Sequence, residues 1–441
     1  MNELEEILEL VENLIKTNNN KSLSYIQKTI LRESLANPKK TYDQIAEEYG
    51  YSDNYIKQRV APELWKMLSE SLAEKVNKKN CYSLLEKALK VNPKKAFSQP
   101  ILTRLESPEG QVPLDSAFYI ERQPEEGRCY EEMLKNGALL RIKAPKKMGK
   151  SSLMVRLLNY AKKQNYHTVR LSLNCADKAV FTSTEKFLRW LCANATRHLQ
   201  LESKLNDFWD KDIGILLSCS LYFQGYLLQE INNPILLAID EVNQIFDYPD
   251  LTRDFLCLLR SWHEETKDIY VWQKLRLLLV NSTDVYIPLN INKSPFNVGL
   301  SIELLPFTQA QVQDLALRHG LNLTYLELNL LIDLLGGFPY LVRLALYESV
   351  RRKISLENLL VSAATDTGIF SSHLHSQLWY LQKNTELATA YQQVVKADEP
   401  ISLEQVKGFK LQSLGLVNLQ GDLATVSCDL YRKYFRVKFA E

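Results

Sequence analysis

The residues that point most directly to chemistry lie in one short stretch, APKKMGKSSL, at residues 144–153. The stretch follows the apolar run ALLRIK and leads into an amphipathic segment typical of a helix. A strand, a turn whose backbone N–H groups converge and a helix N-terminus together bind phosphate groups. The stretch differs from the pattern G-x-x-x-x-G-K-[ST] only at the first glycine, where Ala144 stands.

The residues of this loop have expected roles toward ATP. Gly149 permits close approach of the backbone, Lys150 reaches the β and γ phosphates, and the Ser151 hydroxyl ligates Mg²⁺. Alanine at the first position is small, although it adopts positive φ less freely than glycine. Further expected nucleotide contacts are Pro145, Lys146, Lys147, Met148 and Ser152. The alternative is a lysine-rich turn without a ligand.

Two carboxylates stand at the end of a second apolar run, PILLAIDE, at residues 234–241. Ligands of open α/β sheets bind outside the carboxyl ends of the strands. We therefore expect Asp240 to hold Mg²⁺, mostly through water, and Glu241 to activate the attacking water as general base. The alternative is that both residues only cap the helix that follows.

A third run, LRLLLVNSTD, ends in polar side chains. Ser282 and Thr283, with Asn281 before them, are candidates for sensing the γ-phosphate and join Lys150 and Glu241 as candidate catalytic residues. The alternative is a turn that stops a buried strand. Arginines that could neutralise charge in the transition state are numerous, and the sequence does not choose among Arg122, Arg253, Arg260 and Arg343.

Short apolar runs separated by amphipathic stretches indicate an α/β fold with a central parallel sheet. The strand candidates are residues 138–144, 167–173, 234–240, 275–282 and 300–305. Residues before about 90 and from 307 to 375 show helical periodicity, and the last part is a helix-plus-hairpin unit with Gly421-Asp422 at its turn. We expect boundaries at 1–97, 98–116 (a linker), 117–306, 307–384 and 385–441.

Residues 42–61, YDQIAEEYGYSDNYIKQRVA, have the pattern of a helix-turn-helix. The small Ala46 lets two helices cross closely and Gly50 takes the turn conformation. In a DNA reader the second helix presents its polar side chains to the major groove. Those side chains are Asn54, Lys57, Gln58 and Arg59. The alternative is a protein-docking unit, since Glu47 and Glu48 lie nearby and the N-terminal helix is acidic.

The overall composition restricts the class of protein less than the motifs do. Lys and Arg number 54 against 52 Asp and Glu, and a net charge of +2 neither requires nor excludes a nucleic-acid partner. The 7 cysteines include no C-x-x-C pair, which favours a reducing cytoplasm over a disulfide framework or a thiolate zinc site. No window of 18 residues is uninterruptedly apolar, so we expect no membrane span.

Several stretches resemble the cyanobacterial AAA-like P-loop ATPases, relatives of the signal-transducing STAND NTPases. They are FYIER (118–122), RIKAPKKMGKSSL (141–153), ILLAIDEVNQIF (235–246), KSPFNVG (293–299) and LLGGFPYLVRLALY (334–347). Residues 41–80 resemble the N-terminal helix-turn-helix domain of vWA-MoxR-associated proteins. Residues 411–435, LQSLGLVNLQGDLATVSCDLYRKYF, are similar to the winged helix that usually follows the ATPase.

The resemblance implies a P-loop NTPase core at 117–306, a helical lid at 307–384 and a winged helix at 385–441. It implies that Tyr119, Ile120 and Arg122 line the adenine side and that Pro339, in the sequence Gly337-Phe338-Pro339, contacts the nucleotide from the lid. Lys146-Lys147 departs from the more usual Arg-Gln, and no sensor arginine follows the strand that ends at Thr283.

The predicted function is an ATP-binding, ATP-hydrolysing regulatory switch that couples nucleotide state to double-stranded DNA or to protein partners of a signalling or defence system. Nucleotide-dependent association of copies of the chain is compatible with it. One alternative is a nucleotide-binding adaptor between proteins that does not bind DNA. The other is an AAA+ ATPase that remodels DNA.

Overall fold

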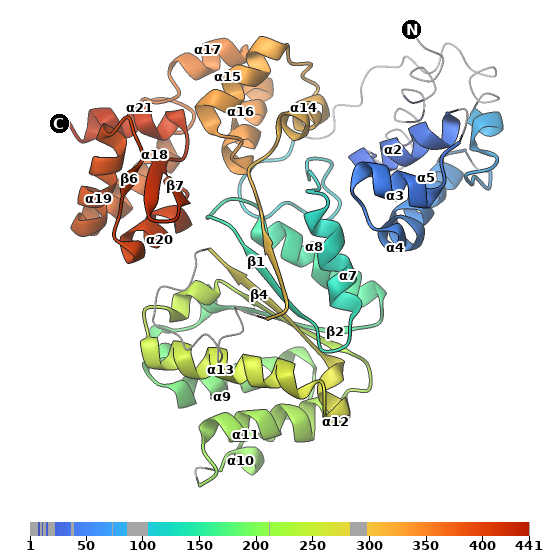
Figure 1. Cartoon of the computed structure of the whole chain (residues 1–441), viewed down its shortest axis with the longest axis vertical. Helices are drawn as coiled ribbons and strands as arrows, with labels where there is room; N and C mark the ends of the chain where they lie inside the picture. Colours follow the sequence, from blue (N-terminus) through green and yellow to red (C-terminus); the bar gives the residue numbers. More distant parts are fainter. Residues whose placement is uncertain are drawn as a thin grey trace.

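The computed structural model describes residues 23–36, 39–72, 74–85, 105–210, 212–282 and 298–440, together with residues 8, 11 and 15. A central sheet domain carries a helical unit made by the N-terminal residues at one side, and a helical lid and a C-terminal unit above it (Figure 1). Thr283 and most of the stretch KSPFNVG lie outside the described residues.

The central sheet is five-stranded and entirely parallel, with the order β2-β3-β4-β1-β5. Its strands are β1 (Leu139–Lys143), β2 (His167–Ser172), β3 (Ile235–Asp240), β4 (Leu275–Asn281) and β5 (Leu300–Glu303). Each strand falls inside one of the five apolar runs picked out in the sequence. The prediction of an α/β fold with a parallel sheet is confirmed.

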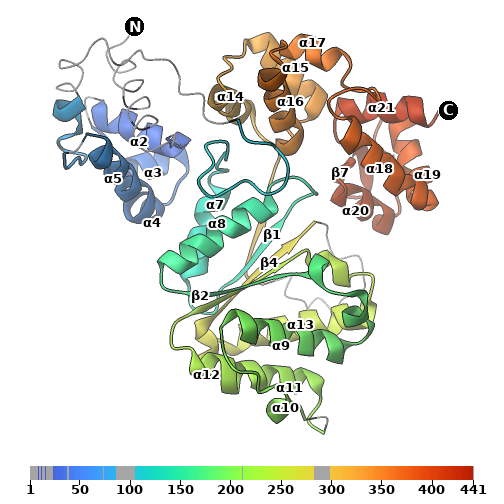
Figure 2. The ribbon, with the colours of Figure 1, turned by 180° about the vertical axis from the view of Figure 1, so that it is seen from behind.

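Helices cover both faces of the sheet, which is why the inner strands β3 and β4 are buried along their whole length. α7 (Glu125–Leu134) and α8 (Lys150–Lys163) lie on one face, and α9 (Thr184–His198), α11 (Ile215–Tyr222) and α13 (Pro249–Glu265) on the other (Figure 2). In β1, Leu140 and Ile142 pack in the core on the α8 side, whereas Leu139 packs in the core on the α9 side.

Shorter elements complete this domain. They are α10 (Leu205–Phe208), α12 (Leu228–Glu230), the π-helix η4 (Phe223–Leu227) and the 3₁₀ turns η2 (Leu173–Cys175), η3 (Lys178–Thr182), η5 (Val242–Ile245) and η6 (Tyr270–Lys274).

The lid follows β5 and consists of α14 (Gln309–Arg318), α15 (Tyr325–Leu335), α16 (Pro339–Arg352) and α17 (Leu356–Val361). Gly337, with φ +68°, fixes where α16 begins. Its carbonyl accepts a 2.8 Å hydrogen bond from the Phe307 N–H. A Cβ at this position would stand 2.5 Å from the Phe307 carbonyl oxygen, so no larger residue fits without displacing the backbone. The start of α16 is thereby tied to the chain leaving β5.

We define the C-terminal unit as α18 (Ser371–Lys383), α19 (Thr385–Lys396), β6 (Ile401–Ser402), α20 (Gln405–Ser413), β7 (Val417–Gln420), β8 (Leu423–Val426) and α21 (Asp429–Lys438). It includes α18, which the expected boundary at residue 384 assigns to the lid. Its three strands form an antiparallel sheet in the order β6-β8-β7, and Gly421-Asp422 make the hairpin turn. Only α20 lies between β6 and β7, whereas a helix-turn-helix requires two helices. The winged-helix assignment therefore stays a prediction.

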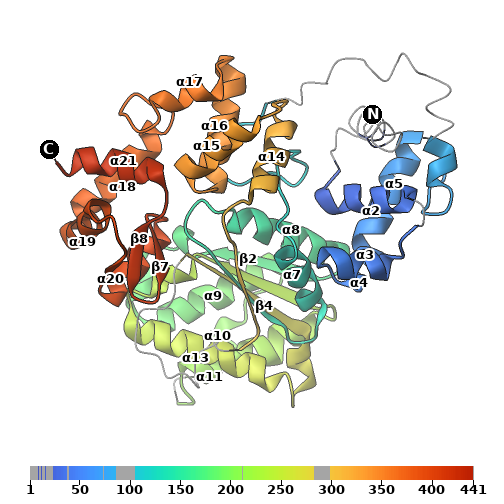
Figure 3. The same ribbon diagram turned by 45° about the horizontal axis from the view of Figure 1, so that its top comes forward.

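The N-terminal unit is built from α2 (Tyr25–Leu35), α3 (Tyr42–Tyr49), α4 (Asp53–Tyr55), the π-helix η1 (Ile56–Val60) and α5 (Ala61–Leu72) (Figure 3). Gly50 ends α3 in the left-handed conformation, with φ +71°. The π-turn precedes Pro62, which has no N–H and would clash with the carbonyl four residues earlier in a regular helix. The Ala61 N–H donates instead to the Ile56 carbonyl, and the second helix continues without a break.

Among the helices in the described part of the chain, none has both the length and the apolar composition that crossing a bilayer requires.

Candidate functional site

The phosphate-loop stretch leaves β1 and turns directly into α8, which begins at Lys150. Two of its residues have a left-handed backbone, Lys147 with φ +65° and Gly149 with φ +94°. The left-handed turn at Gly149 is the N-cap of α8, so the unpaired N–H groups of the helix face the loop. The backbone thus has the strand, turn and helix N-terminus that anion binding needs.

The ammonium group of Lys150 is enclosed by the loop. Its Nζ donates to the carbonyl oxygens of Ala144 at 2.8 Å and Pro145 at 2.9 Å. Burial lowers the pKa of Lys150 to about 8, although the charges of Glu241 and Asp240 act in the opposite direction. Negative charge brought close to Nζ would raise the pKa of Lys150 again.

The structure brings the hydroxyl of Ser151 and the carboxylate of Asp240 together. Ser151 Oγ donates to Asp240 Oδ2 at 3.0 Å. Asp240 ends β3 and is buried, which raises its pKa, and the Ser151 hydrogen bond works against that rise. Two oxygen ligands at a helix N-terminus beside a strand end are the donor set that Mg²⁺ takes with phosphates. Within the described residues no cluster of three or more His, Cys, Asp or Glu could hold a metal by protein ligands alone.

Glu241 follows Asp240 in a left-handed conformation, with φ +57°. Asn243 connects it to the next strand: Asn243 Nδ2 donates to Glu241 Oε2 at 3.4 Å, and Asn243 Oδ1 accepts from the Ser282 N–H at 3.0 Å. The sequence interpretation did not single out Asn243, although it stands two residues after Glu241. Its amide fixes the distance between the candidate base and the end of β4.

The ends of β3, β4 and β1 are neighbours in the sheet, so the end of β4 at Asn281 lies between the strand ends that lead to Asp240 and to Lys150. Asn281 and Ser282 are both buried there, and the Ser282 hydroxyl has no hydrogen-bond partner among the described residues. Thr283, the third candidate, lies outside the described residues.

Arg122 contacts the phosphate loop through a backbone carbonyl group of the loop. It is buried, and Nη1 donates to the Met148 carbonyl at 2.7 Å. A Cβ added to Gly149 would stand 2.5 Å from Arg122 Nη2, so the absence of a side chain admits the guanidinium. The Arg122 N–H donates to Glu126 Oε1 at 2.8 Å, and the Tyr119 hydroxyl donates to the same oxygen at 2.9 Å.

Glu126 is a second residue that the sequence interpretation missed. Its carboxyl group is fully buried in the first turn of α7, and burial together with the charge of Glu121 raises its pKa to about 7. In the sequence, Glu126 stands out only by its place four residues after Arg122, in the first turn of a helix, where its carboxylate can accept the Arg122 N–H. Of the other expected adenine contacts, Ile120 is buried and Tyr119 packs its ring 3.3 Å from the Arg156 guanidinium carbon.

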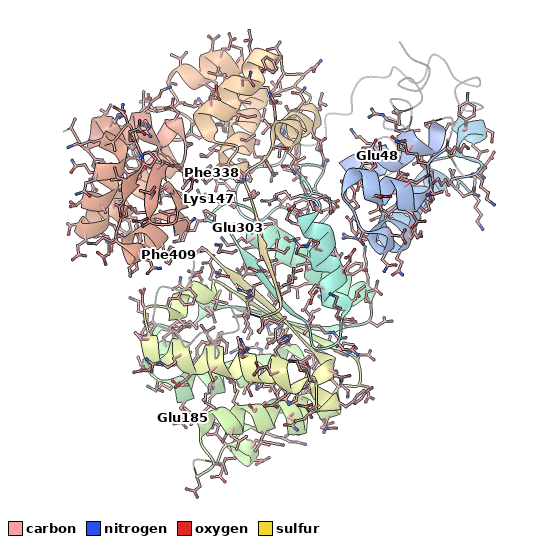
Figure 4. The ribbon with its side chains drawn as sticks, viewed as in Figure 1. Glu48, Lys147, Glu185, Glu303, Phe338 and Phe409 are labelled. Carbon is pink, nitrogen blue, oxygen red and sulfur yellow. The ribbon has the colours of Figure 1, made fainter. Side chains whose placement is uncertain are left out.

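The outer side of the loop contacts the lid and the C-terminal unit. The Lys146 N–H donates to the Ser413 carbonyl at 2.9 Å. Lys147 Nζ lies 3.1 Å from His373 Nδ1 and 3.8 Å from the centre of the Tyr340 ring. A cavity of about 170 Å³ opens at this junction, lined among others by Lys146, Lys147, Phe338, Tyr340, His373 and Tyr431. Figure 4 labels Lys147 and Phe338 where the sheet domain, the lid and the C-terminal unit meet. Pro339 begins α16 directly beside the cavity.

Two further loop residues hold other segments. Ser152, at the start of α8, accepts the Val112 N–H at 3.0 Å through its hydroxyl. Its side chain therefore binds the segment before the sheet domain. Pro145 packs toward the C-terminal unit, where a Cβ on Gly415 would meet its Cβ at 3.6 Å.

Comparison with protein families gives one match that spans most of the chain. The model of the AAA-like domain matches residues 107–437. The chain belongs to the AAA-like domain family. A second model, the N-terminal helix-turn-helix of vWA-MoxR associated proteins, matches residues 2–88, which confirms the helix-turn-helix prediction. No curated protein matches the chain in sequence.

Among solved structures, the Walker-type ATPase PABY2304 of Pyrococcus abyssi superposes on this chain with a TM-score of 0.50. It is 12% identical, and the alignment covers 74% of this chain and 98% of that one. The AAA-like domain therefore has the fold of a Walker-type ATPase. The ORC2 protein of Aeropyrum pernix (15% identical, 72% and 93% covered, TM-score 0.38) and Cdc6p of Pyrobaculum aerophilum (14%, 75% and 97%, 0.39) are also similar.

The four candidate DNA contacts do not share one environment. Asn54 and Gln58 are exposed. Lys57 is exposed too, and its Nζ pairs with Asp43 at 2.7 Å and Asp53 at 2.8 Å. Arg59 points the other way, toward the AAA-like domain, where its guanidinium carbon lies 3.3 Å from the centre of the Tyr130 ring. The second helix of the helix-turn-helix, which begins with α4 and η1, therefore directs one of its four candidate DNA contacts, Arg59, toward the sheet domain.

Proposed function

We propose that the chain binds ATP with Mg²⁺ at the loop between β1 and α8, hydrolyses it, and uses the nucleotide state as a regulatory switch. In this proposal the switch controls how the N-terminal and C-terminal units contact DNA or protein partners. The hydrogen bond between Ser151 and Asp240 carries the proposal, because it joins the phosphate loop to the acidic end of β3 in one site.

The residues of the site divide the work as follows. Lys150 leaves its loop carbonyls to bind the β and γ phosphates, and the N–H groups at the start of α8 bind phosphate oxygens. Ser151 and Asp240 hold Mg²⁺, which supplies charge neutralisation when bound. Glu241 takes a proton from the attacking water and Asn243 holds its carboxylate in place. Ser282 contacts the γ-phosphate through its hydroxyl, which has no hydrogen-bond partner among the described residues.

The contacts of the loop support a regulatory role. The Lys146 N–H is occupied by a carbonyl of the C-terminal unit, and Lys147 binds the buried His373 of that unit. Burial lowers the pKa of His373 to about 3, so the ring is neutral and its Nδ1 accepts a hydrogen bond from Lys147. Phosphate groups that bind to this loop therefore compete with the loop's contacts to the C-terminal unit or rearrange them. The nucleotide-bound and nucleotide-free states then differ in these contacts, and a regulatory switch needs such a difference.

A second candidate function, the adaptor between proteins, is favoured by one observation. Arg59 of the helix-turn-helix packs against aromatic rings of the sheet domain and not toward solvent. A helix-turn-helix that already contacts a protein surface is suited to protein docking. The two functions differ in whether DNA is retained at low salt and released as salt rises.

The proposed function is tested by measuring ATP binding and turnover for the wild type, Lys150→Ala and Glu241→Gln. Lys150→Ala is expected to weaken ATP binding roughly 10- to 100-fold, because it removes charge-assisted contacts to phosphate. Glu241→Gln is expected to bind ATP normally and to lower kcat by about 100-fold or more, because it removes the base.

Lys163→Ala, an exposed lysine at the other end of α8, is the matched control and is expected to change neither quantity. Wild-type affinity in Lys150→Ala would refute the phosphate site. Wild-type turnover in Glu241→Gln would refute the role of the base while leaving nucleotide binding in place.

A further inference from the structure

The N-terminal unit meets the AAA-like domain through one face of its second helix. Figures 1 and 3 both place α4 beside α7, and the contact is aromatic. The Tyr55 ring stacks on Tyr130 of α7, with centroids 6.2 Å apart and planes at 10°, and Tyr51 also stacks on Tyr55, with centroids 6.3 Å apart. Gly127 of α7 lies against this ring and against Gln123: an added Cβ would make an ordinary contact of 3.6 Å with the Tyr55 ring but would stand 2.8 Å from Gln123 Oε1. We call this face, Tyr51, Tyr55 and Arg59, the docking face.

Arg59 is the centre of this contact. Its guanidinium carbon lies 3.3 Å from the centre of the Tyr130 ring, 5.1 Å from that of Tyr160 and 5.5 Å from that of Tyr55. Its Nη1 is buried and has no hydrogen-bond partner within the described ranges, and its charge is stabilised by these rings together with the nearby charge of Glu121. Cation–π attraction is strongest where water is excluded.

The docking face is joined to the phosphate loop by two consecutive residues. Gln123 Nε2 donates to the Tyr55 hydroxyl at 2.8 Å, and its Oε1 accepts the Gly127 N–H at 3.0 Å. Arg122, the residue before it, donates to the Met148 carbonyl of the loop at 2.7 Å. A shift of Tyr55 therefore acts on the peptide that carries Arg122, and Arg122 supports the loop beside Gly149.

We propose that the docking face of the helix-turn-helix binds α7 and α8 of the same chain, and that docking and nucleotide binding favour each other through Gln123 and Arg122. The docked unit holds Arg122 against the loop, so the loop loses less conformational freedom when phosphate binds. By linkage, bound nucleotide tightens docking by the same factor. The nucleotide part rests on the proposed function; the docking part does not.

The experiment is hydrogen exchange of the full chain, followed by mass spectrometry on residues 53–60, combined with ATP affinity. Without nucleotide, Arg59→Met and Tyr130→Leu are each expected to raise exchange in residues 53–60 about tenfold, since each removes the cation–π contact. Using both variants separates docking from any damage to the fold of one unit. Lys57→Ala, on the same helix but exposed and paired with Asp43 and Asp53, is expected to leave exchange unchanged.

The second readout tests the link. ATP is expected to lower exchange in residues 53–60 of the wild type, and Arg59→Met is expected to bind ATP about fivefold or more weakly. Unchanged exchange in both undocking variants would overturn the docking face. Raised exchange with unchanged or tighter ATP binding would overturn the link. A wild type that binds no ATP would refute the proposed function and the link but leave the docking result standing.

Discussion

Glu126→Gln gives a quantitative test of the network behind the phosphate loop. In the folded protein Oε1 of Glu126 accepts from the Tyr119 hydroxyl and the Arg122 N–H, while Oε2 is buried without a partner in the described residues. Burial, reinforced by the charge of Glu121, raises the pKa from its ordinary value of 4.5 to about 7. Glutamine keeps an oxygen acceptor for both donors and removes the charge.

The sign of the pH dependence follows from the direction of this shift. Because the folded-state pKa is above the unfolded value, the folded protein holds the proton more tightly. The stability that Glu126 contributes is fully present below pH 4.5 and is lost as the pH rises through about 7. The shift corresponds to about 3 kcal/mol in the free energy of unfolding. Glutamine leaves a buried NH₂ group unpaired, which costs roughly 1 kcal/mol at every pH.

The assay is urea unfolding of the wild type and Glu126→Gln at about pH 5 and pH 8.5, followed by the fluorescence of the buried Trp262 and Trp272. The variant is expected to be slightly less stable at the lower pH and more stable at the higher one, with the difference changing by about 2.5 kcal/mol, because a part of the contribution is already lost at pH 5. Glu125→Gln, the preceding residue on α7, is the control. A difference that is the same at both pH values would refute the argument.

Three further predictions concern the site itself. Gly149→Ala is expected to weaken ATP binding about tenfold or more, because φ at this position is +94° and a Cβ would displace Arg122. Gly421→Ala is the control: φ there is +66° and a Cβ would meet open space, so the ATP affinity is expected to stay unchanged. ATP affinity is expected to fall as the pH rises through about 8, where Lys150 loses its proton. If the ATP affinity of Lys150→Ala showed the same fall near pH 8, the fall could not be assigned to Lys150. Asn243→Ala is expected to lower kcat about tenfold at unchanged ATP affinity, because Glu241 loses its hydrogen bond, and an equal loss in Gln244→Ala, an exposed neighbour, would argue against that role.

The fold could be predicted from the sequence because its signals are local. Buried parallel strands are short continuous apolar runs, and the run at residues 138–144 contains β1, Leu139–Lys143. The phosphate loop and the acidic strand end were also recognisable, since glycine, lysine and carboxylates stand at fixed positions after a strand. Their meeting in space, shown by Ser151 and Asp240, follows from strand order.

What the sequence could not show depends on contacts between distant parts of the chain. Arg59 has the side chain of a DNA contact, and only the packing of α7 reveals that Tyr130 lies over its guanidinium. The expectation that Arg122 lines the adenine side stays a prediction, and only the structure shows that its guanidinium donates to the Met148 carbonyl. The sequence alone does not mark Asn243 as a site residue, because its second hydrogen-bond partner is the backbone N–H of Ser282 at the end of the neighbouring strand β4.

The central claim is that the loop at Lys150 and Ser151 and the strand end at Asp240 form one site for ATP and Mg²⁺. Calorimetric titration of ATP in the presence of Mg²⁺ and in the presence of a chelator, for the wild type and Asp240→Asn, tests it most directly. The wild type is expected to bind ATP more tightly with Mg²⁺, and this gain is expected to vanish in Asp240→Asn while binding in chelator persists. An undiminished Mg²⁺ gain in Asp240→Asn, or no ATP binding by the wild type, would contradict the claim.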